Sequence, residues 1–261
     1  MNFFLRTSFI NSVFLNRTVR IDVLAPVKNQ SDMSRELLLI QDGQDLEKMR
    51  FSSLLRNNAA AGERFICVGV HAGIDRIQEY GVAGMPDYMQ RGSKAGLYTQ
   101  FIMHEVLPLV KLQTGYSTFT KYHSLGFSLG GLMSIDMGLS HPTLFNSAAA
   151  FSGAFWWRSR DIKDGYNDER DRILHAKVRT LKPNKTQRFF FQAGKLDETA
   201  DRNGNGIIDA IDDTLDLIKE LKSAGFSEKQ INYLEVEDGA HNIATWGRVM
   251  PAYLDWLLQL H

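Results

Sequence analysis

Short apolar runs alternate with longer amphipathic segments along most of the chain. Residues 36–41 (ELLLIQ) and 64–70 (RFICVGV) are almost continuously apolar, as is typical of strands buried on both faces of a sheet. The segments between such runs show the spacing of amphipathic helices. This repeated alternation of strand and helix predicts an α/β fold with a mostly parallel central sheet and helices on both faces.

The individual elements follow from the same pattern. Strands are predicted at 9–14 and 17–26, as an antiparallel pair, and then at 36–41, 64–70, 121–128, 146–153, 188–194 and 231–237. Helices are predicted at 45–62, 94–113, 129–142, 167–181, 212–225 and 242–260. The sequence shows no internal repeat, no low-complexity linker and no second apolar core. We therefore expect one domain over residues 1–261.

The composition is that of an ordinary soluble globular protein. Apolar residues make up 44% and charged residues 23% of the 261 positions. The 30 basic residues balance the 30 acidic ones, so nothing indicates nucleic acid or an anionic membrane surface as a partner. No stretch reaches the roughly 18 to 20 apolar residues that a membrane span requires. The single cysteine, Cys67, lies in an apolar run, which favours a buried structural thiol.

The N-terminal segment bears on localisation. Residues 1–15 are mildly apolar but interrupted by Arg6 and Asn11, and they lack a basic start and a small-residue cleavage site. We predict that they belong to the fold, and the lack of a signal peptide favours a soluble cytoplasmic protein. A signal removed upstream of residue 1 would place the protein outside the cytoplasm. The compartment therefore stays open, as does the oligomeric state.

The most specific chemical motif is a G-x-S-x-G pentapeptide, Gly126 to Gly130, between a predicted strand and a predicted helix. A sharp turn there would hold the hydroxyl of Ser128 above the carboxyl end of the sheet, at a helix N-terminus that favours developing negative charge. The two glycines would let strand and helix approach closely. We interpret Ser128 as a nucleophile. The alternative is a packing turn whose serine only caps the helix.

A serine hydroxyl needs a nearby base that accepts its proton. Four histidines follow Ser128. His241 directly follows the last predicted strand on a short glycine-containing loop, which would place it at the carboxyl edge of the sheet beside Ser128. His141 lies at a helix end, His175 lies in a charged helix, and His261 is the last residue. His241 is therefore the predicted general base, and capping of the terminal helix is its alternative role.

At this point the chain resembles the esterase branch of the α/β-hydrolases, which includes enterochelin esterases, feruloyl and acetyl xylan esterases, S-formylglutathione hydrolases and mycolyltransferases. The resemblance extends along nearly the whole chain. It is carried by QDGQDL (41–46), GFSLGGL (126–132), FSGAFWW (151–157), AGKLDE (193–198) and GAHN (239–242). It implies the α/β-hydrolase fold and a catalytic order of serine, acid and histidine along the chain.

The resemblance also implies an oxyanion hole of two backbone N–H groups. One would belong to Leu129, directly after the nucleophile, and the other to Gln44, the residue after an Asp-Gly pair. Such donors typically supply about 3 to 4 kcal/mol each to the transition state. Asp42 itself is interpreted as a turn-forming residue rather than a catalytic one.

The third member of the triad must orient His241 and stabilise its cation. In similar enzymes this acid follows a small glycine loop at the end of the seventh strand. The segment AGKLDE places Asp197 there. Glu198, one residue later, is the alternative.

The substrate pocket is less well defined by the sequence. Trp156 and Trp157 follow the strand after the nucleophile, at the end of the sheet where substrates bind. Either tryptophan could line the pocket or simply cover the sheet edge. In the long connection at 73–96, the side chains of Arg76, Glu79 and Tyr80 are possible substrate contacts, and structural ion pairing is their alternative role.

Residues 201–212 (DRNGNGIIDAID) match the pattern of a calcium-binding loop with a turn at Gly206. Oxygen-only ligands suit Ca²⁺. The predicted ligands are the side chains of Asp201, Asn203, Asn205, Asp209 and Asp212 and the backbone carbonyl of Ile207. Two neutral ligands and an Asp in the last position indicate moderate affinity. We expect a structural Ca²⁺ that holds the triad acid in place, and the alternative is a solvated asparagine-glycine turn.

The leading prediction is a serine esterase that hydrolyses a small-molecule or carbohydrate-linked carboxylic ester through an acyl-enzyme, without an organic cofactor. One alternative is an acyltransferase that uses the same triad. Another is a non-catalytic, calcium-stabilised binding domain. The sequence does not choose the acyl or alcohol part of the substrate, because one fold serves many such reactions.

Overall fold

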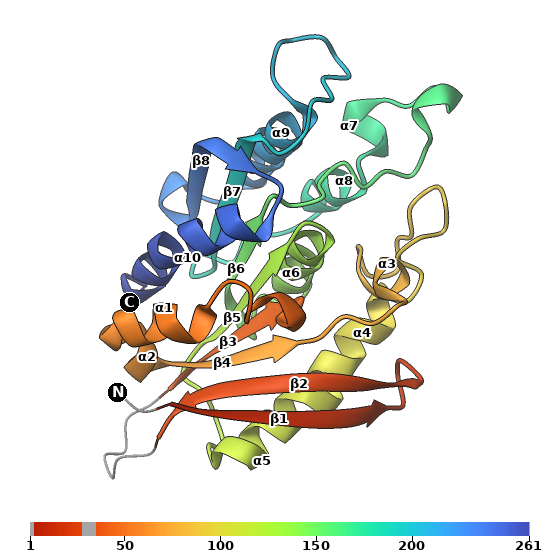
Figure 1. The fold of residues 1–261 in the computed structure, drawn as a ribbon. Coiled ribbons are helices and arrows are strands. Elements are labelled where there is room, and N and C mark those ends of the chain that lie inside the picture. The colour runs from red at the N-terminus through yellow and green to blue at the C-terminus, as the bar shows by residue number, and fades with distance from the viewer. Residues whose placement is uncertain (1–2, 28–34, 261) are drawn as a thin grey trace.

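The computed structural model of the protein describes residues 3–27 and 35–260. Its centre is an eight-stranded sheet with strand order β1-β2-β4-β3-β5-β6-β7-β8 (Figure 1). The strands are β1 (Phe3–Ser12), β2 (Arg17–Pro26), β3 (Glu36–Gln41), β4 (Phe65–Val70), β5 (Tyr122–Phe127), β6 (Phe145–Phe151), β7 (Arg188–Leu196) and β8 (Ile231–Ala240). β1 and β2 are antiparallel to each other, and β2 is antiparallel to β4. All other neighbours are parallel, which confirms the predicted fold class.

Helices cover both faces of this sheet (Figure 1). One face carries α1 (Phe51–Asn57), α2 (Ala59–Arg64) and α10 (Ile243–Leu258). The opposite face carries α4 (Ala95–Phe101), α5 (Leu107–Thr114), α6 (Leu129–Ser140), α8 (Ile173–Val178) and α9 (Asp209–Ser223). Shorter turns are η1 (Gly43–Asp45), α3 (Arg76–Glu79), η2 (Ile102–Val106), η3 (Ile162–Asp164), α7 (Asp168–Asp171) and η4 (Glu228–Gln230).

The sheet separates two apolar cores, and this explains the continuously apolar strands. In β3, Leu37 and Leu39 pack into the core under α4, α5 and α6. Leu38 and Ile40 pack into the core under α1, α2 and α10. Because successive side chains of a strand point to opposite faces, a central strand covered on both sides has no solvent-facing position.

Three of the predicted helices are interrupted. The region at 167–181 is divided at Arg172 (φ −75°, ψ 109°) into α7 and α8. The segment predicted as one helix at 45–62 is divided at Asn58, which leaves helical geometry (φ −110°, ψ 83°) and whose side chain caps α2 by accepting from Ala61 N–H at 3.1 Å. The segment at 94–113 contains a π-helical turn, η2, directly before α5. Pro108 accounts for this irregularity, because proline has no N–H and its ring clashes with the carbonyl of the preceding turn.

Two expectations from composition also concern the fold. Cys67 is buried in β4, and burial raises the pKa of its thiol, as expected of an inert structural cysteine. Among the helices in the described part of the chain, none is both long enough and apolar enough to cross a membrane.

Candidate active site

Ser128 occupies a strained turn between β5 and α6. Its backbone has φ 55° and ψ −121°, a conformation that non-glycine residues rarely adopt. A Cβ at Gly126 would lie 1.9 Å from the carbonyl oxygen of Gly130, so only glycine lets strand and helix meet here. Ser128 N–H donates to Phe151 O at 3.0 Å, and Ser128 O accepts from Ala154 N–H at 3.1 Å. The neighbouring strand β6 and the segment after it therefore hold the turn.

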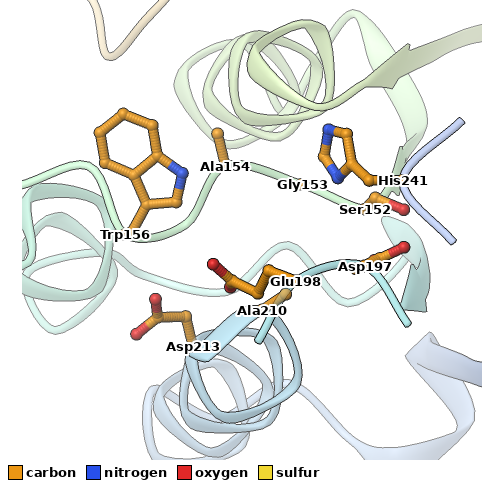
Figure 2. A pocket seen from close by; sticks show the side chains of 9 residues that line it. All are labelled: Ser152, Gly153, Ala154, Trp156, Asp197, Glu198, Ala210, Asp213 and His241. Carbon is orange, nitrogen blue, oxygen red and sulfur yellow. The ribbon is translucent and has the colours of Figure 1, made fainter. Parts of the chain in front are cut away.

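The register of β7 and β8 places the predicted acid and base side by side. The two strands are parallel, and Leu196 pairs with Ala240, so Asp197 and His241 directly follow paired residues. Both line one cavity, and Figure 2 shows them together at one end of it. Asp197 Oδ2 accepts from Gly194 N–H at 3.0 Å. Within the described residues, its buried Oδ1 has no hydrogen-bond partner, so it is available to an imidazole N–H.

Trp246 of α10 links the histidine to the serine turn. The ring of His241 makes an edge contact with Trp246 at 5.4 Å between ring centroids. Trp246 stacks on Phe127, the residue before Ser128, at 5.2 Å. Its indole N–H also donates to Ser152 Oγ at 3.0 Å. The sequence pattern identifies Trp246 only as a core residue of the last helix, and its linking role depends on contacts between distant segments.

The environment of His241 favours the neutral imidazole. Desolvation by the cavity wall, opposed by the carboxylate of Asp197 and assisted by the charge of Arg76, lowers the pKa of His241, although the residue as a whole is exposed. A neutral imidazole is the form that accepts a proton from a serine.

The two predicted oxyanion donors come from segments that touch. Leu129 is the first residue of α6, so its N–H has no acceptor in the preceding turn of the helix. Gln44 lies in η1, where its side chain donates to Asp42 Oδ1 at 3.1 Å and accepts from Ala72 N–H at 3.0 Å. A Cβ at Gly130 would lie 2.7 Å from Asp42 Oδ2, so the turn that carries Gln44 packs directly against the start of α6.

The cavity lined by Asp197 and His241 has a volume of about 240 Å³, and Ser128 is not among its lining residues. It is lined by Ser152, Gly153, Ala154, Trp156, Asp197, Glu198, Ala210, Asp213 and His241 (Figure 2). Trp156 and Asp213 lie at the end away from Asp197 and His241. Residues 152–154 were not predicted to line a cavity. The Ser-Gly pair directly after a strand, at the edge of the sheet where the other site residues lie, is the sequence signal that could have indicated them.

Of the two tryptophans predicted near the pocket, only Trp156 lines this cavity. Trp157 is fully buried, and its indole N–H donates to Met85 O at 3.4 Å. Adjacent residues point in different directions, and here the second one points into the core.

Glu198, the alternative acid, also lines the cavity. Desolvation, and then the negative charges of Asp209 and Asp213, raise the pKa of Glu198. It does not follow a residue paired between β7 and β8 as Asp197 does, so the register favours Asp197 as the partner of His241.

The three side chains of the 73–96 connection that were possible substrate contacts, Arg76, Glu79 and Tyr80, are largely occupied by contacts within the protein. Glu79 is fully buried and accepts two hydrogen bonds of 2.6 Å from Arg17. Arg76 forms an ion pair with Asp42 at 2.6 Å. Tyr80 is buried. These contacts match the structural alternative of the sequence analysis rather than substrate binding.

The other described histidines after Ser128 do not line this cavity. His175 is fully buried, its Nε2 lies 2.9 Å from Asp213 O, and desolvation lowers its pKa to about 3. His141 is the C-terminal capping residue of α6. His261 lies outside the described residues.

The predicted calcium loop projects beyond the sheet between β7 and α9 (Figure 1). Asp201 accepts from the backbone N–H groups of Gly204, Asn205 and Gly206 at 2.8, 3.1 and 2.9 Å. The side-chain amides of Asn203 and Asn205 both donate to Asp212 Oδ2, at 2.8 and 2.7 Å. The predicted ligands at loop positions 3, 5 and 12 therefore converge on one point.

Asp209 departs from the predicted ligand set. Its carboxylate accepts from Arg202 N–H at 2.9 Å and pairs with the Arg202 guanidinium at 3.1 Å. Ile207 is 39% exposed, and its N–H donates to Asn205 Oδ1. In the described part of the chain, no three His, Cys, Asp or Glu side chains are grouped as they would be around a metal. The groups that meet are the Asp212 carboxylate and the NH2 groups of the two asparagines, whose amide oxygens accept from the backbone N–H groups of Asn205 and Ile207. The side-chain oxygens of this loop are hard ligands of the kind that Ca²⁺ binds.

The strained serine turn, the register-paired acid and histidine, and the helix-covered parallel sheet are features of an α/β-hydrolase. A model of the family described as "Putative esterase" matches residues 12–257, so the chain belongs to this family. No curated protein matches the sequence.

Solved structures show the same fold. The enterobactin esterase FES from Shigella flexneri, solved in the presence of enterobactin, has a TM-score of 0.73 and 18% identity over 98% of this chain. The chain spans only 58% of the length of that esterase. An IroE-like serine hydrolase from Shewanella oneidensis has a TM-score of 0.74 and 18% identity, covering 98% of this chain and 80% of the other. A ferulic acid esterase has a TM-score of 0.72 and 18% identity, with 100% of both chains covered.

Proposed function

We propose that the protein is a serine esterase that cleaves a carboxylic ester through an acyl-enzyme. Ser128 is the nucleophile, His241 is the general base and then the general acid, and Asp197 orients His241. The backbone N–H groups of Gln44 and Leu129 form the oxyanion hole. Membership of the esterase family supports the reaction class.

The observation that carries the proposed triad is the parallel register of β7 and β8. Pairing of Leu196 with Ala240 brings Asp197 and His241 to the same level at the carboxyl edge of the sheet. Trp246 then connects His241 to Phe127, next to the strained serine. All three residues directly follow strands of the sheet at its carboxyl edge, which supports the proposed triad.

In each half of the proposed reaction, His241 accepts one proton and then donates it. Ser128 Oγ attacks the ester carbonyl as its proton passes to His241, and the carbonyl electrons move to the oxygen held by the two backbone N–H groups. The tetrahedral intermediate collapses, and the leaving alkoxide takes the proton from His241. A water then repeats the sequence on the acyl-enzyme, and the carboxylic acid and free serine are released.

The cavity limits which part of a substrate is enclosed. Its volume of about 240 Å³ is below the roughly 300 to 1,000 Å³ of typical drug-sized ligand pockets. We propose that it takes one small portion of the ester, with Trp156 as a flat apolar wall, and that the remainder stays outside. Esters of the kind named for the structural relatives, those of enterobactin and ferulic acid, are therefore reasonable first substrates to assay.

We also propose that Ca²⁺ binds the loop at 201–212 and stabilises the segment that follows Asp197. The groups that would hold the ion are Asp201, Asn203, Asn205, Asp212 and the carbonyl of Ile207, with Asp209 acting only if it leaves Arg202. The match of residues 201–212 to the pattern of a calcium-binding loop supports this proposal, as does the presence of four side chains with ligand oxygens in one exposed loop. The ion has no part in the proposed proton transfers.

The decisive experiment for the esterase proposal is Ser128→Ala, assayed with p-nitrophenyl acetate, a feruloyl ester and enterobactin. We expect hydrolysis to fall at least about 10³-fold with unchanged Tm, and labelling by a fluorophosphonate probe to disappear. Ser124→Ala is a matched control. Ser124 lies in β5, the strand that leads to Ser128, but its hydroxyl accepts from Ser134 at 2.9 Å in the core. Full activity in Ser128→Ala would refute the assignment.

A further inference from the structure

An ion pair joined by two hydrogen bonds lies at the start of η1, the turn that carries the proposed oxyanion donor Gln44. Arg76 Nε donates to Asp42 Oδ1 at 2.6 Å, and Arg76 Nη2 donates to Asp42 Oδ2 at 2.7 Å. The Asp42 side chain is only 2% exposed, so the guanidinium replaces the solvent that the carboxylate has lost. This parallel, two-bond geometry fixes direction as well as distance.

Asp42 is the residue through which the turn is held. Its backbone is left-handed (φ 59°, ψ 46°), and its N–H donates to the hydroxyl of Tyr80 at 3.3 Å. Its Oδ1 also accepts from the side chain of Gln44 at 3.1 Å. Its Oδ2 lies against Gly130 at the start of α6. The position of the Gln44 backbone therefore depends on where the Asp42 carboxylate lies.

Arg76 also reaches the nucleophile's side of the site. Its Nη2 donates to Phe127 O, the carbonyl directly before Ser128, at 3.4 Å. Its guanidinium carbon lies 5.0 Å from the ring centroid of Tyr80, which holds the side chain from the other side. One guanidinium thus contacts both the turn that carries the second oxyanion donor and the strand that carries the nucleophile.

We infer that Arg76 is a positioning residue of the esterase reaction, which sets the Gln44 N–H and the Ser128 turn at a fixed separation through its bonds to Asp42 and Phe127. The inference rests on the proposed function, since it concerns the same oxyanion hole. It adds a residue that does not itself touch the substrate. Oxyanion donors act through preorganisation, and a displacement of about 1 Å can lower a rate about 100-fold.

The competing explanation is that Arg76 only stabilises the 73–96 connection. The chain contains a matched ion pair that separates the two roles. Arg17 and Glu79 also form two bonds of 2.6 Å, and Glu79 is the last residue of the same short helix α3. This second pair joins α3 to β2, whereas the Arg76 pair joins α3 to the Asp42 turn. If Arg76 acted only by anchoring α3, breaking either ion pair would therefore have the same effect on stability and activity.

The experiment compares Arg76→Gln, Arg76→Lys and Arg17→Lys by steady-state kinetics on the best ester, with Tm measured for each. For Arg76→Gln we expect kcat to fall about 10- to 100-fold with KM within about twofold, because the oxyanion is bound only in the transition state. Inhibition by a boronic acid that mimics the tetrahedral adduct should weaken by the same factor as kcat/KM. Arg17→Lys should lower Tm and leave kcat within about twofold.

Arg76→Lys keeps the buried Asp42 paired with a cation, so the fold is retained even if Arg76→Gln is unstable. An ammonium cannot reproduce the two-bond fork, and we expect a smaller loss of kcat, about threefold to tenfold. An unchanged kcat in Arg76→Lys and Arg76→Gln would overturn the inference. So would an equal loss of kcat in Arg17→Lys, or a rise in KM alone, which would make Arg76 a substrate contact.

The pH profile gives a second readout. The charged groups that act on the pKa of His241 are Asp197, from the segment after β7, and Arg76, from α3, and the uncharged ring of Trp246 in α10 packs against it. Removal of the Arg76 charge makes protonation of His241 easier, so the acidic limb of kcat/KM should move to higher pH in Arg76→Gln and stay in place in Arg76→Lys. An unmoved limb in Arg76→Gln together with an unchanged kcat would overturn the inference.

Failure of the inference is distinguishable from failure of the proposed function. If the unaltered protein hydrolyses no ester and Ser128 takes no fluorophosphonate, the proposed function itself is wrong. If it hydrolyses esters and the Arg76 variants match it, only the positioning role is wrong.

Discussion

The proposed nucleophile and the proposed acid are held in contrasting ways. Ser128 lies in a strained turn. It is closed by a glycine contact with no space for a Cβ, by a hydrogen bond that Ser128 N–H donates to β6 and by one that it accepts from the segment after β6. Asp197 is half-buried at the end of a strand, and one hydrogen bond from Gly194 N–H restrains its carboxylate. The segment that follows it is largely exposed as far as α9.

The contrast separates two ways of building a catalytic group. Strain at Ser128 requires rigid surroundings, since a costly backbone conformation persists only where packing leaves no alternative. The acid has only to present one oxygen to a histidine, and strand register achieves this without a rigid loop. We therefore expect an added side chain at the glycines of the serine turn to affect folding and activity together, and changes at the acid to affect activity alone.

The largest effect is expected for Gly126→Ala. The new methyl group would collide with the backbone of Gly130, so β5 and α6 must separate and the turn must relax. We expect a loss of about 2–3 kcal/mol of unfolding free energy or more, together with loss of esterase activity. Chemical denaturation and ester hydrolysis measure the two. Gly96→Ala in α4, where a Cβ meets nothing within 4 Å, is the control and should be neutral or stabilising.

Asp197→Asn should leave folding intact and lower kcat about 10³- to 10⁴-fold, because His241 loses the carboxylate that orients it and stabilises its cation. The matched variant Glu198→Gln, one residue later in the same cavity, should change kcat by no more than about threefold. Steady-state kinetics and Tm of both variants decide between the two acids. A larger loss of activity in Glu198→Gln would reverse the assignment.

A smaller effect is expected in the pH dependence. The pKa of His241 is lowered from 6.5, so the neutral base persists below that pH and kcat/KM should fall only as pH drops through the lowered value. Asp197→Asn removes the charge that opposes this shift, so the residual activity should show its acidic limb at still lower pH. Profiles of kcat/KM between about pH 4 and 8 test both statements. An acidic limb above pH 6.5 in the unaltered protein would contradict them.

The smallest effect is expected from calcium. If Ca²⁺ binds at 201–212 with moderate affinity, a tenfold excess over its Kd stabilises the protein by about 1.4 kcal/mol, which corresponds to a rise in Tm of about 2–4 °C. EDTA treatment followed by added Ca²⁺ measures this shift, and Asp212→Asn should abolish it. Identical Tm and kcat under all conditions would show that Ca²⁺ neither stabilises the loop nor helps to position Asp197.

Much of the fold could be predicted because the burial of a segment determines how its apolar and polar residues are spaced along the sequence. The continuously apolar runs at 36–41 and 64–70 are central strands, and the alternation of strand and helix has the predicted order. The break at Asn58 and the π-helical turn before Pro108 were not predicted. Both are local departures within segments whose apolar spacing stays helical, so periodicity does not reveal them.

The candidate site was predictable to the extent that its residues follow strands. Ser128, Asp197 and His241 each come directly after a strand, and parallel strands end at one edge of a sheet. The direction of a side chain was not predictable, and so Trp156 lines the cavity while Trp157 enters the core.

The sequence by itself determined the α/β architecture, the place of the serine turn and the segments that carry an acid and a histidine, because these depend on local patterns of a few residues. Only the tertiary structure decided that Asp197 and His241 follow paired residues, that Trp246 contacts both His241 and Phe127, and that Arg76 pairs with Asp42. The physical reason is that strand register, ring stacking and ion pairing join residues far apart in the chain. Such contacts are selected by the packing of the whole sheet and its helices, and no local segment contains them.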